Sequence, residues 1–197
     1  MRVVITGSSG LAAVIKRTLE ATPYRGNTIE VTPVRCDDIT MNGVNFWGFR
    51  GHKPMDVLIN LAHQDQAKIL DIAHEAWELE KTKTIINISS RAAQPNISKG
   101  YMYASEKAQL NHLANNYQYN SKKRYKMTNL NLGLLNDENL PSVKHQDVAG
   151  FIYKLITSYP DYEIADVTLQ AHANYQDVQS DKETLKEVYY HLHTDSL

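Results

Sequence analysis

Short runs rich in β-branched residues alternate along this chain with longer stretches whose apolar residues recur at helical spacing. Six runs are predicted strands, at residues 3–6, 28–34, 57–60, 84–89, 127–132 and 164–169. Between them, stretches that begin near Leu11, Ile69 and Val148 repeat apolar side chains every three or four residues, as one face of a helix does. This strand–helix–strand order predicts an α/β fold, a doubly wound parallel sheet with helices on both faces.

The remaining segments are less regular. Residues 37–54 hold three glycines and no clear period, so we expect a loop or one short turn of helix there. Residues 171–180 are polar, and the apolar residues after Ser180 fall at helical spacing behind a capping-box sequence. The predicted organisation is one domain at 1–170, followed at 171–197 by a polar linker and a C-terminal helix.

Charge and cysteine content exclude several classes of protein. The 197 residues include 21 basic and 22 acidic side chains, and a formal net charge of -1 gives no general attraction for nucleic acid or an anionic membrane. No apolar run approaches the ~20 residues that span a bilayer, and too few precede the first glycine for a signal peptide. A single cysteine, Cys36, excludes an internal disulfide and a cysteine-cluster metal site. We expect a cytoplasmic protein with a small-molecule substrate, no nucleic-acid or membrane partner and no bound metal.

Two glycines lie in the turn between the first predicted strand and the first predicted helix. The turn consists of Gly7, Ser8, Ser9, Gly10 and Leu11. Gly7 permits a tight turn, Gly10 lets the backbone approach a pyrophosphate, and the small side chain of Ala13 lets the helix pack close to the sheet. The free N–H groups at the helix start would face the phosphates. This placement favours a nucleotide-binding turn; the alternative is a plain strand-to-helix turn that binds no nucleotide.

A serine, a tyrosine and a lysine form a second candidate site. Tyr103 and Lys107 lie four residues apart, which places the phenol and the ammonium on one helical face. Tyr119 and Lys123 have the same spacing, but Tyr119 lies in the polar end of a helix, predicted at 117–126, and no candidate chemical group precedes it. Tyr103 instead follows Ser90 by 13 residues, and Ser90 ends a central strand at the edge where open α/β sheets bind ligands.

These three side chains suit proton transfer to or from an oxygen atom. A free tyrosine is a poor proton shuttle at neutral pH, and a cation one helical turn away favours the phenolate form of Tyr103. The hydroxyl of Ser90 can hold a substrate carbonyl or alcohol oxygen beside that proton. The alternative is a tyrosine that packs on the sheet without a catalytic role. The combination of Ser90, Tyr103 and Lys107 with the glycine turn favours the catalytic interpretation.

The chain resembles the short-chain dehydrogenases/reductases (SDRs) over roughly residues 1–170. The resemblance rests on the Thr-Gly-x-x-Gly turn, an Asn-x-Ala segment after a central strand, and a serine 13 residues before a Tyr-x-x-x-Lys motif. It implies a Rossmann fold that binds NADP(H) or NAD(H), and hydride transfer to or from a carbonyl or alcohol carbon. Tyr103 would be the general acid/base and would also contact the cofactor. Ser90 would position the oxygen, and Lys107 would assist Tyr103 and bind the nicotinamide ribose.

The same resemblance assigns further residues to the cofactor. Three residues would line the adenosine ribose: Asn60, Leu61 and Ala62. Asp38 would contact the adenine amino group. Arg35 follows the second predicted strand, where a basic side chain faces the 2′-phosphate of NADP, so NADP is favoured over NAD. The alternatives are that Arg35 is an ordinary exposed arginine, or that Asp37 binds the ribose at the end of a strand two residues longer.

The sequence departs from the family pattern in the lengths of several segments and in one catalytic residue. Only 29 residues separate Asn60 from Ser89, so one sheet helix is missing or trimmed, and the short connection before it predicts that the third strand is absent. No asparagine matches the family's fourth catalytic residue, and residues 63–66 occupy that neighbourhood. The substrate-covering segment between Gly133 and Val143 is short, which predicts an open site.

The predicted function is that of an SDR-type oxidoreductase that uses NADP(H). The alternatives are an SDR-type epimerase or dehydratase, and a non-catalytic nucleotide-binding scaffold. The resemblance implies a homodimer or homotetramer, with interfaces on the helix that carries Tyr103 and on the helix at 148–158. Apolar surface for such an interface, or for packing within the chain, comes from Met102, Leu110, Leu113 and Tyr117.

Overall fold

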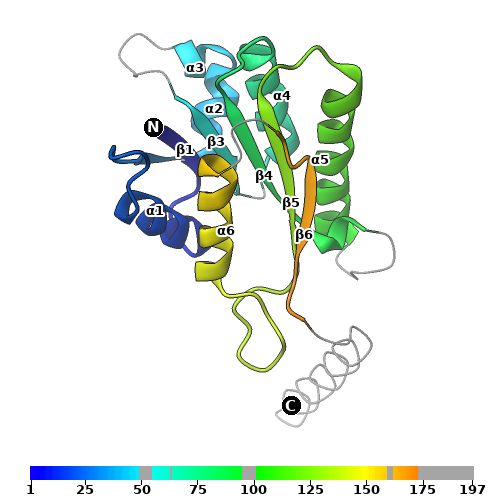
Figure 1. The fold of residues 1–197 in the computed structure, drawn as a ribbon. Coiled ribbons are helices and arrows are strands. Elements are labelled where there is room, and N and C mark those ends of the chain that lie inside the picture. The colour runs from blue at the N-terminus through cyan, green and yellow to red at the C-terminus, as the bar shows by residue number, and fades with distance from the viewer. Residues whose placement is uncertain (49–54, 63, 95–100, 159–161, 173–197) are drawn as a thin grey trace.

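The computed structural model, which describes residues 1–48, 55–62, 64–94, 101–158 and 162–172, has one parallel sheet in the order β2-β1-β3-β4-β5-β6 (Figure 1). The strands are β1 (Arg2–Thr6), β2 (Glu30–Val34), β3 (Val57–Asn60), β4 (Thr84–Ser90), β5 (Lys126–Leu132) and β6 (Asp166–Leu169). Each predicted strand matches within two residues at either end, and the α/β prediction is confirmed. Among the described residues no strand lies beyond β2, in line with the predicted loss of the third strand.

Helices cover both faces of this sheet (Figure 1). One face is covered by α1 (Leu11–Ala21) and α6 (His145–Thr157). The other face is covered by α2 (Cys36–Asn42), α4 (Gln66–Trp77) and α5 (Tyr101–Asn120). Two shorter elements are α3 (Asn45–Gly48) and the 3₁₀ turn η1 (Arg91–Ala93). The connection between β3 and β4 thus keeps a helix of 12 residues, which is the trimmed alternative of the sequence prediction.

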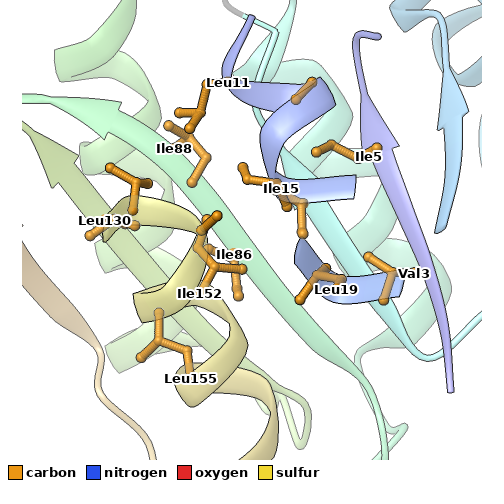
Figure 2. Close-up of a cluster of buried hydrophobic side chains, with 14 of the residues drawn as sticks. Val3, Ile5, Leu11, Ile15, Leu19, Ile86, Ile88, Leu130, Ile152 and Leu155 are labelled. Carbon is orange, nitrogen blue, oxygen red and sulfur yellow. The ribbon is translucent and has the colours of Figure 1, made fainter. Parts of the chain in front are cut away.

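The core beneath α1 and α6 is built from the side chains that recur at helical spacing. Ile15 and Leu19 of α1 and Ile152 of α6 are fully buried in one cluster with Ile86 of β4 (Figure 2). Full burial of a side chain of this size contributes roughly 1.5–3 kcal/mol. The periodic residues of the sequence therefore mark the faces that hold these two helices on the sheet.

The prediction of a loop or one short turn at 37–54 is wrong for the described part of that segment, which forms α2 and α3. A capping box starts α2, because the carboxylate of Asp38 accepts the backbone N–H of Arg35 at 3.2 Å. Cys36 and Ile39 are buried on one side of the helix. A helix of seven residues repeats too few apolar positions to reveal a period, so the pattern did not indicate it.

The helix predicted at 117–126 is in fact the last turn of α5 followed by a loop. α5 ends at Asn120 and β5 begins at Lys126. The Ser121 hydroxyl donates to the carbonyl oxygen of Tyr117 at 2.7 Å and accepts the N–H of Lys123 at 3.1 Å. Such side-chain bonds to the backbone compete with the helical pattern, which explains why the helix stops here.

Side chains of α1 cover backbone groups of β2, the strand at one edge of the sheet. The Lys16 amino group donates to the carbonyl oxygen of Val31 at 3.1 Å, and the Glu20 carboxylate accepts the N–H of Val31 at 3.4 Å. Lys16 and Glu20 also pair with each other. Pro33, two residues further along, has no N–H to donate. The free edge of β2 therefore presents few unpaired backbone groups.

A cluster of ring side chains joins α4 to α5 at the opposite end of the sheet from the glycine turn. His74 of α4 stacks on Tyr117 of α5 with ring centroids 3.7 Å apart, and its Nδ1 lies 2.8 Å from the Tyr125 hydroxyl. The Tyr117 hydroxyl also bonds the carboxylate of Asp71. Burial lowers the pKa of His74, although Glu78 opposes this effect. The folded protein therefore favours the neutral form of His74.

Protonation of His74 should destabilise the protein. Because the folded state resists a proton that the unfolded state accepts, the free energy of unfolding should decrease as the pH falls below 6.5, the ordinary histidine value. Urea denaturation at pH 7.5 and at pH 5.5 measures how much of the free energy of unfolding is lost between the two. This loss should be smaller in His74→Gln than in the wild type. His112→Gln removes an exposed histidine on α5 and should leave the loss unchanged. Equal losses in the wild type and in His74→Gln would contradict the assignment to His74.

None of the described helices is both long and apolar enough to cross a membrane. The predicted C-terminal helix and most of the predicted linker, from residue 173 onward, lie outside the described residues, as does residue 63.

Candidate functional site

The glycine turn lies where β1 meets α1. β1 ends at Thr6 and α1 begins at Leu11, as predicted. Gly7 has φ +97° and Gly10 has φ +54°, backbone conformations that side chains disfavour. Apart from Gly10 itself and the adjoining backbone, no atom of the described residues lies within 4 Å of the place that a β-carbon would take at Gly10. The turn is therefore open beside Gly10, and a ligand can approach the backbone closely there.

The start of α1 is suited to an anion. The first turn of the helix contains no acidic side chain, and no side chain caps it at Gly10. Ser8 and Ser9 are exposed in the turn before it. The positive end of the helix dipole therefore meets no carboxylate from its own helix, which leaves it free to attract a phosphate.

The segment after β3 is tied to this turn. The Thr6 hydroxyl oxygen accepts the N–H of Leu61 at 2.8 Å and the N–H of Ala62 at 3.0 Å. A β-carbon at Gly7 would lie 3.8 Å from that of Ala62. The structure thus brings Leu61 and Ala62 to the glycine turn, although the two segments are more than 50 residues apart in sequence.

The small residue of α1 that lies next to Gly7 is Ala12, whereas Ala13 was predicted to be the small residue that lets the helix pack close to the sheet. A β-carbon at Gly7 would lie 3.9 Å from that of Ala12, which is buried. Ala13 is only half-buried. The glycine pattern alone does not fix the rotation of the helix about its axis, so it did not distinguish these neighbours.

Arg35 follows β2 directly, as predicted, and lies next to the glycine turn, because the carbonyl oxygen of Val34 accepts the N–H of Gly7 at 3.0 Å. The Arg35 side chain is 81% exposed, with a guanidinium nitrogen 3.5 Å from the carboxylate of Asp37. Asp38 is exposed and caps α2. Since β2 ends at Val34 and Asp37 lies in the first turn of α2, the alternative of a strand two residues longer is wrong.

Lys107 is buried on the inner side of α5, and its amino group has two hydrogen-bond acceptors. Nζ donates to the carbonyl oxygen of Ile88 at 2.9 Å and to the side-chain oxygen of Gln66. It lies 5.5 Å from the centroid of the Tyr103 ring. Burial lowers the pKa of Lys107 to about 8, while the nearby carboxylate of Glu106 raises it. The predicted Tyr–Lys pair is therefore in contact, and burial holds the pKa of the lysine well below its ordinary value.

Ser90 ends β4, and Tyr103 lies in the first turn of α5. The Ser90 hydroxyl oxygen accepts the N–H of Ala92 at 3.1 Å, and the hydroxyl donates to the carbonyl oxygen of Leu132 at a long 3.5 Å. α5 packs against η1, the turn that Ser90 caps. Tyr103 is 42% exposed, so a ligand can reach its ring. Lys107 thus lies beside the Tyr103 ring and contacts Ile88 of β4, the strand that Ser90 ends.

A row of buried asparagine amides, here called the amide ladder, crosses the central strands beneath α4 and α5. Asn60 of β3, Asn87 of β4 and Asn129 of β5 are aligned in register. The Asn60 amide nitrogen donates to the side-chain oxygen of Asn87 at 3.1 Å, and the Asn87 amide nitrogen donates to the side-chain oxygen of Asn129 at 3.0 Å. The side chain of Asn60 is therefore engaged in the sheet interior, whereas Leu61 and Ala62 lie at the glycine turn.

Gln66, Asn87 and Asn129 were not among the predicted site residues. A signal was present in the sequence, since a parallel strand covered on both faces should be almost continuously apolar. Asn87 and Asn129 interrupt two such strands. A buried amide requires a hydrogen-bond partner, so each interruption indicated a polar contact inside the protein. Which partner each amide would find depends on the strand order, which the sequence pattern did not specify.

Most of the apolar surface predicted on α5 is used within the chain. Leu110 is fully buried, and Leu113 and Tyr117 are half-buried against the core that α4 and α5 share. Met102 remains 77% exposed beside Tyr101, which is 79% exposed. These four residues were expected to form either a subunit interface or packing within the chain. Leu110, Leu113 and Tyr117 pack within the chain, whereas Met102 does not.

Comparison with known proteins shows likeness in fold only. The sequence matches no protein-family model, and no curated protein matches it. Serine dehydrogenase from Escherichia coli superposes with a TM-score of 0.66 at 15% identity, over 86% of this chain and 97% of that chain. The alcohol dehydrogenase of the archaeon Thermococcus sibiricus, complexed with 5-hydroxy-NADP, gives 0.67 at 14% identity, over 88% and 97%.

A metagenomic short-chain oxidoreductase in complex with NADP gives a TM-score of 0.64 at 19% identity, over 88% of this chain and 98% of that chain. A short-chain dehydrogenase/reductase from Vibrio parahaemolyticus gives 0.67 at 15% identity, over 87% and 100%. These matches agree with the parallel strand order and the glycine turn described above. The described part of the chain therefore has a Rossmann fold with six parallel strands, like that of these short-chain dehydrogenase/reductase structures.

Proposed function

We propose that this protein is an NAD(P)-dependent oxidoreductase of the SDR type, which transfers hydride between NADP(H) and a carbonyl or alcohol substrate. The observation that carries the proposal is the contact between Lys107 and Tyr103 near the end of β4. A buried ammonium beside a ligand-accessible phenol supports acid/base chemistry, and the hydroxyl of Ser90 lies in the adjoining turn. Solved proteins that share the fold are named as dehydrogenases, which agrees with this proposal.

Each of the three side chains has its own task in the proposed reaction. Tyr103 donates its phenolic proton to the substrate oxygen during reduction and takes it back during oxidation. The hydroxyl of Ser90 holds that oxygen; its bond to Leu132 is long at 3.5 Å, so its proton can be redirected to a substrate. The ammonium of Lys107 stabilises the phenolate that remains on Tyr103. The nicotinamide cofactor, when bound, supplies the hydride.

The residues around the glycine turn fit a dinucleotide phosphate. The backbone is open at Gly10, and the first turn of α1 adds no negative charge. Leu61 and Ala62 lie at the same turn. Arg35 offers an exposed cation to a 2′-phosphate, which favours NADP over NAD. Solved neighbours are complexed with NADP, although a 7α-hydroxysteroid dehydrogenase of the same fold is complexed with NADH.

A titration of the purified protein with NADPH and with NADH, followed by cofactor fluorescence, tests the proposal first. Tighter binding of NADPH is expected. If NADH binds more tightly, Arg35 does not select the cofactor. If neither cofactor binds at millimolar concentration, the oxidoreductase proposal fails.

Arg35→Ala should weaken NADPH binding about tenfold or more and change NADH binding little. A hydrogen bond to a charged group contributes about 1.5–3 kcal/mol, and only NADPH carries the 2′-phosphate. The same fluorescence titration measures both dissociation constants. Arg17→Ala, which removes an exposed arginine of α1, serves as the matched control and should leave both constants unchanged. Unchanged NADPH affinity in Arg35→Ala would remove Arg35 from the cofactor site.

A nucleotide-binding scaffold without turnover is the second candidate, and the compact segment after β5 favours it. The N–H of Asn136 bonds the carbonyl oxygen of Val143 at 3.0 Å, and the Asp137 carboxylate accepts the N–H groups of Asn139 and Leu140. A segment folded on itself in this way offers little cover for a substrate. Oxidation of NADPH in the presence of a panel of aldehydes and ketones supports the oxidoreductase, whereas isomerisation without net cofactor consumption supports an epimerase.

A further inference from the structure

We propose that Gln66 is a positioning residue that holds the amino group of Lys107 in place for the reaction with Tyr103. The inference rests on the proposed function, because it assigns a task to a contact within the same site. Gln66 is the first residue of α4, and its side chain is buried between α4, α5 and the end of β4. Its amide oxygen accepts a hydrogen bond from Lys107.

The orientation of the Gln66 amide is fixed by two carbonyl groups. Its nitrogen donates to the carbonyl oxygen of Asn60 at 2.7 Å and to that of Ile88 at 3.0 Å. If the amide were turned over, its oxygen would face these two oxygens and both hydrogen bonds would be lost. The amide oxygen must therefore point toward Lys107.

The contacts of Lys107 complete the geometry. An ammonium has three N–H donors, and two of them are directed to Gln66 and to the carbonyl oxygen of Ile88. Two fixed acceptors limit how the ammonium can rotate and so set the direction of its third donor. Loss of the Gln66 oxygen would leave the ammonium with one acceptor and freedom to rotate about it.

Gln66 is in turn anchored to the amide ladder. The Asn60 side chain donates to the backbone carbonyl oxygen of Gln66 at 2.9 Å and to the side chain of Asn87. The start of α4 is therefore tied to β3 and β4 through side-chain amides. These hydrogen bonds hold the first residue of α4, Gln66, at the end of β3. Because Gln66 accepts a hydrogen bond from Lys107, they also help to hold the Lys107 amino group in place.

The charged and titratable groups around Lys107 come mainly from its own helix. Glu106 raises the pKa of Lys107, burial lowers it more strongly, and the Tyr103 ring lies 5.5 Å from Nζ. From β4 and α4, the contacts are the carbonyl oxygen of Ile88 and the amide of Gln66, neither of which titrates. A neutral acceptor holds the ammonium without the strong stabilisation of its charge that a carboxylate would give.

Two variants of similar size change the acceptor in opposite ways. Gln66→Met removes the acceptor, so the pKa of Lys107 should fall below its wild-type value. Gln66→Glu places a carboxylate against the ammonium, so the pKa of Lys107 should rise by about one to three units. Gln64→Met and Gln64→Glu, at an exposed position two residues away, are the matched controls and should leave that pKa unchanged.

The pKa of Lys107 is measured in the cofactor-free protein from the pH dependence of its side-chain 13Cε NMR signal, which requires no substrate. In the proposed enzyme, the alkaline limb of the pH profile of kcat should move in the same direction as this pKa. Both variants lose the N–H groups that Gln66 donates to the carbonyl oxygens of Asn60 and Ile88, so circular dichroism first checks that each is folded, and either folded variant gives a reading. A purely structural role of Gln66 would not shift the two variants in opposite directions.

The outcomes separate this inference from the proposed function. Opposite shifts of the Lys107 pKa with matching shifts of the pH profile support both. The same NMR shifts in a protein that binds no NADPH and turns over no substrate show the contact but overturn the role in catalysis together with the proposed function. If folded Gln66 variants keep the wild-type pKa and pH profile while the wild type is active, the positioning role of Gln66 is wrong and the proposed function stands.

Discussion

Tyr103→Phe should lower kcat by about 10²- to 10⁴-fold and leave the dissociation constant for NADPH unchanged. The substitution removes only the phenolic hydroxyl, which is the group proposed to exchange a proton with the substrate oxygen. The ring stays in place beside the ammonium of Lys107, so the helix and the glycine turn should keep their structure. Steady-state kinetics with NADPH and the best carbonyl substrate, beside a fluorescence titration of the variant, measures the two quantities separately.

The chain provides a control of the same kind within α5. Tyr119 precedes Lys123 by four residues, as Tyr103 precedes Lys107, but Tyr119 is 76% exposed and the Lys123 amino group pairs with Glu163 at 2.9 Å. Tyr119→Phe should therefore leave kcat unchanged. A loss in Tyr119→Phe as large as in Tyr103→Phe, or no loss in Tyr103→Phe, would contradict the assignment of the acid/base group.

Lys107→Met should abolish measurable turnover and, separately, change how stability depends on pH. Turnover should fall at least as far as in Tyr103→Phe, because the phenolate would lose the charge that stabilises it. The effect on stability follows from burial, which lowers the pKa of Lys107 to about 8 from the ordinary value of 10.5. Holding a charged lysine in the interior therefore costs the wild type stability at neutral pH.

The direction of the pH effect follows from proton binding. Between pH 8 and 10.5 the unfolded chain keeps a proton on Lys107 that the folded protein releases, so the free energy of unfolding should increase with pH. From pH 7.5 to 9.5 Lys107 should contribute a gain of about 2 kcal/mol to the wild type that Lys107→Met lacks. Burial raises the pKa of the Cys36 thiol, which opposes the gain equally in both proteins, so the measured quantity is the difference between them. The range ends below pH 10 because Tyr117 and Tyr125, whose pKa values burial raises, oppose the gain at higher pH.

Urea denaturation of the wild type and Lys107→Met at the two pH values gives this difference. Lys68→Met removes an exposed lysine of α4 and should keep the full wild-type gain. If Lys107→Met shows the same gain as the wild type, Lys107 is not buried as a charged group at neutral pH. The outcome is independent of any substrate, so it tests the site even before a reaction is found.

The strands and the glycine turn could be predicted because their signals are local. Val57–Asn60 is almost continuously apolar, as a strand covered on both faces must be, and the predicted bounds of β3 are those of the structure. The residues of α1 that repeat every four positions are the ones that the sheet buries. Arg35 could be placed after β2 for the same reason, since the end of a strand is visible in the sequence.

The polar interior of the site could not be predicted in this way, because it depends on which strands lie side by side. Asn60, Asn87 and Asn129 come from three strands that are neighbours only in the folded sheet. The partner of Lys107 is a glutamine 41 residues earlier, which reaches it because α4 begins at the end of β3. The sequence spacing of Tyr103 and Lys107 indicated the pair but gave no sign that the lysine is buried.

The edge strand β2 also bears on how the protein behaves at high concentration. An exposed strand edge can add a strand from another molecule and start aggregation. At β2 the backbone of Val31 is already bonded to Lys16 and Glu20, and Pro33 has no N–H for an incoming strand. A sheet that ends at β2 is therefore protected against the addition of a further strand from that side.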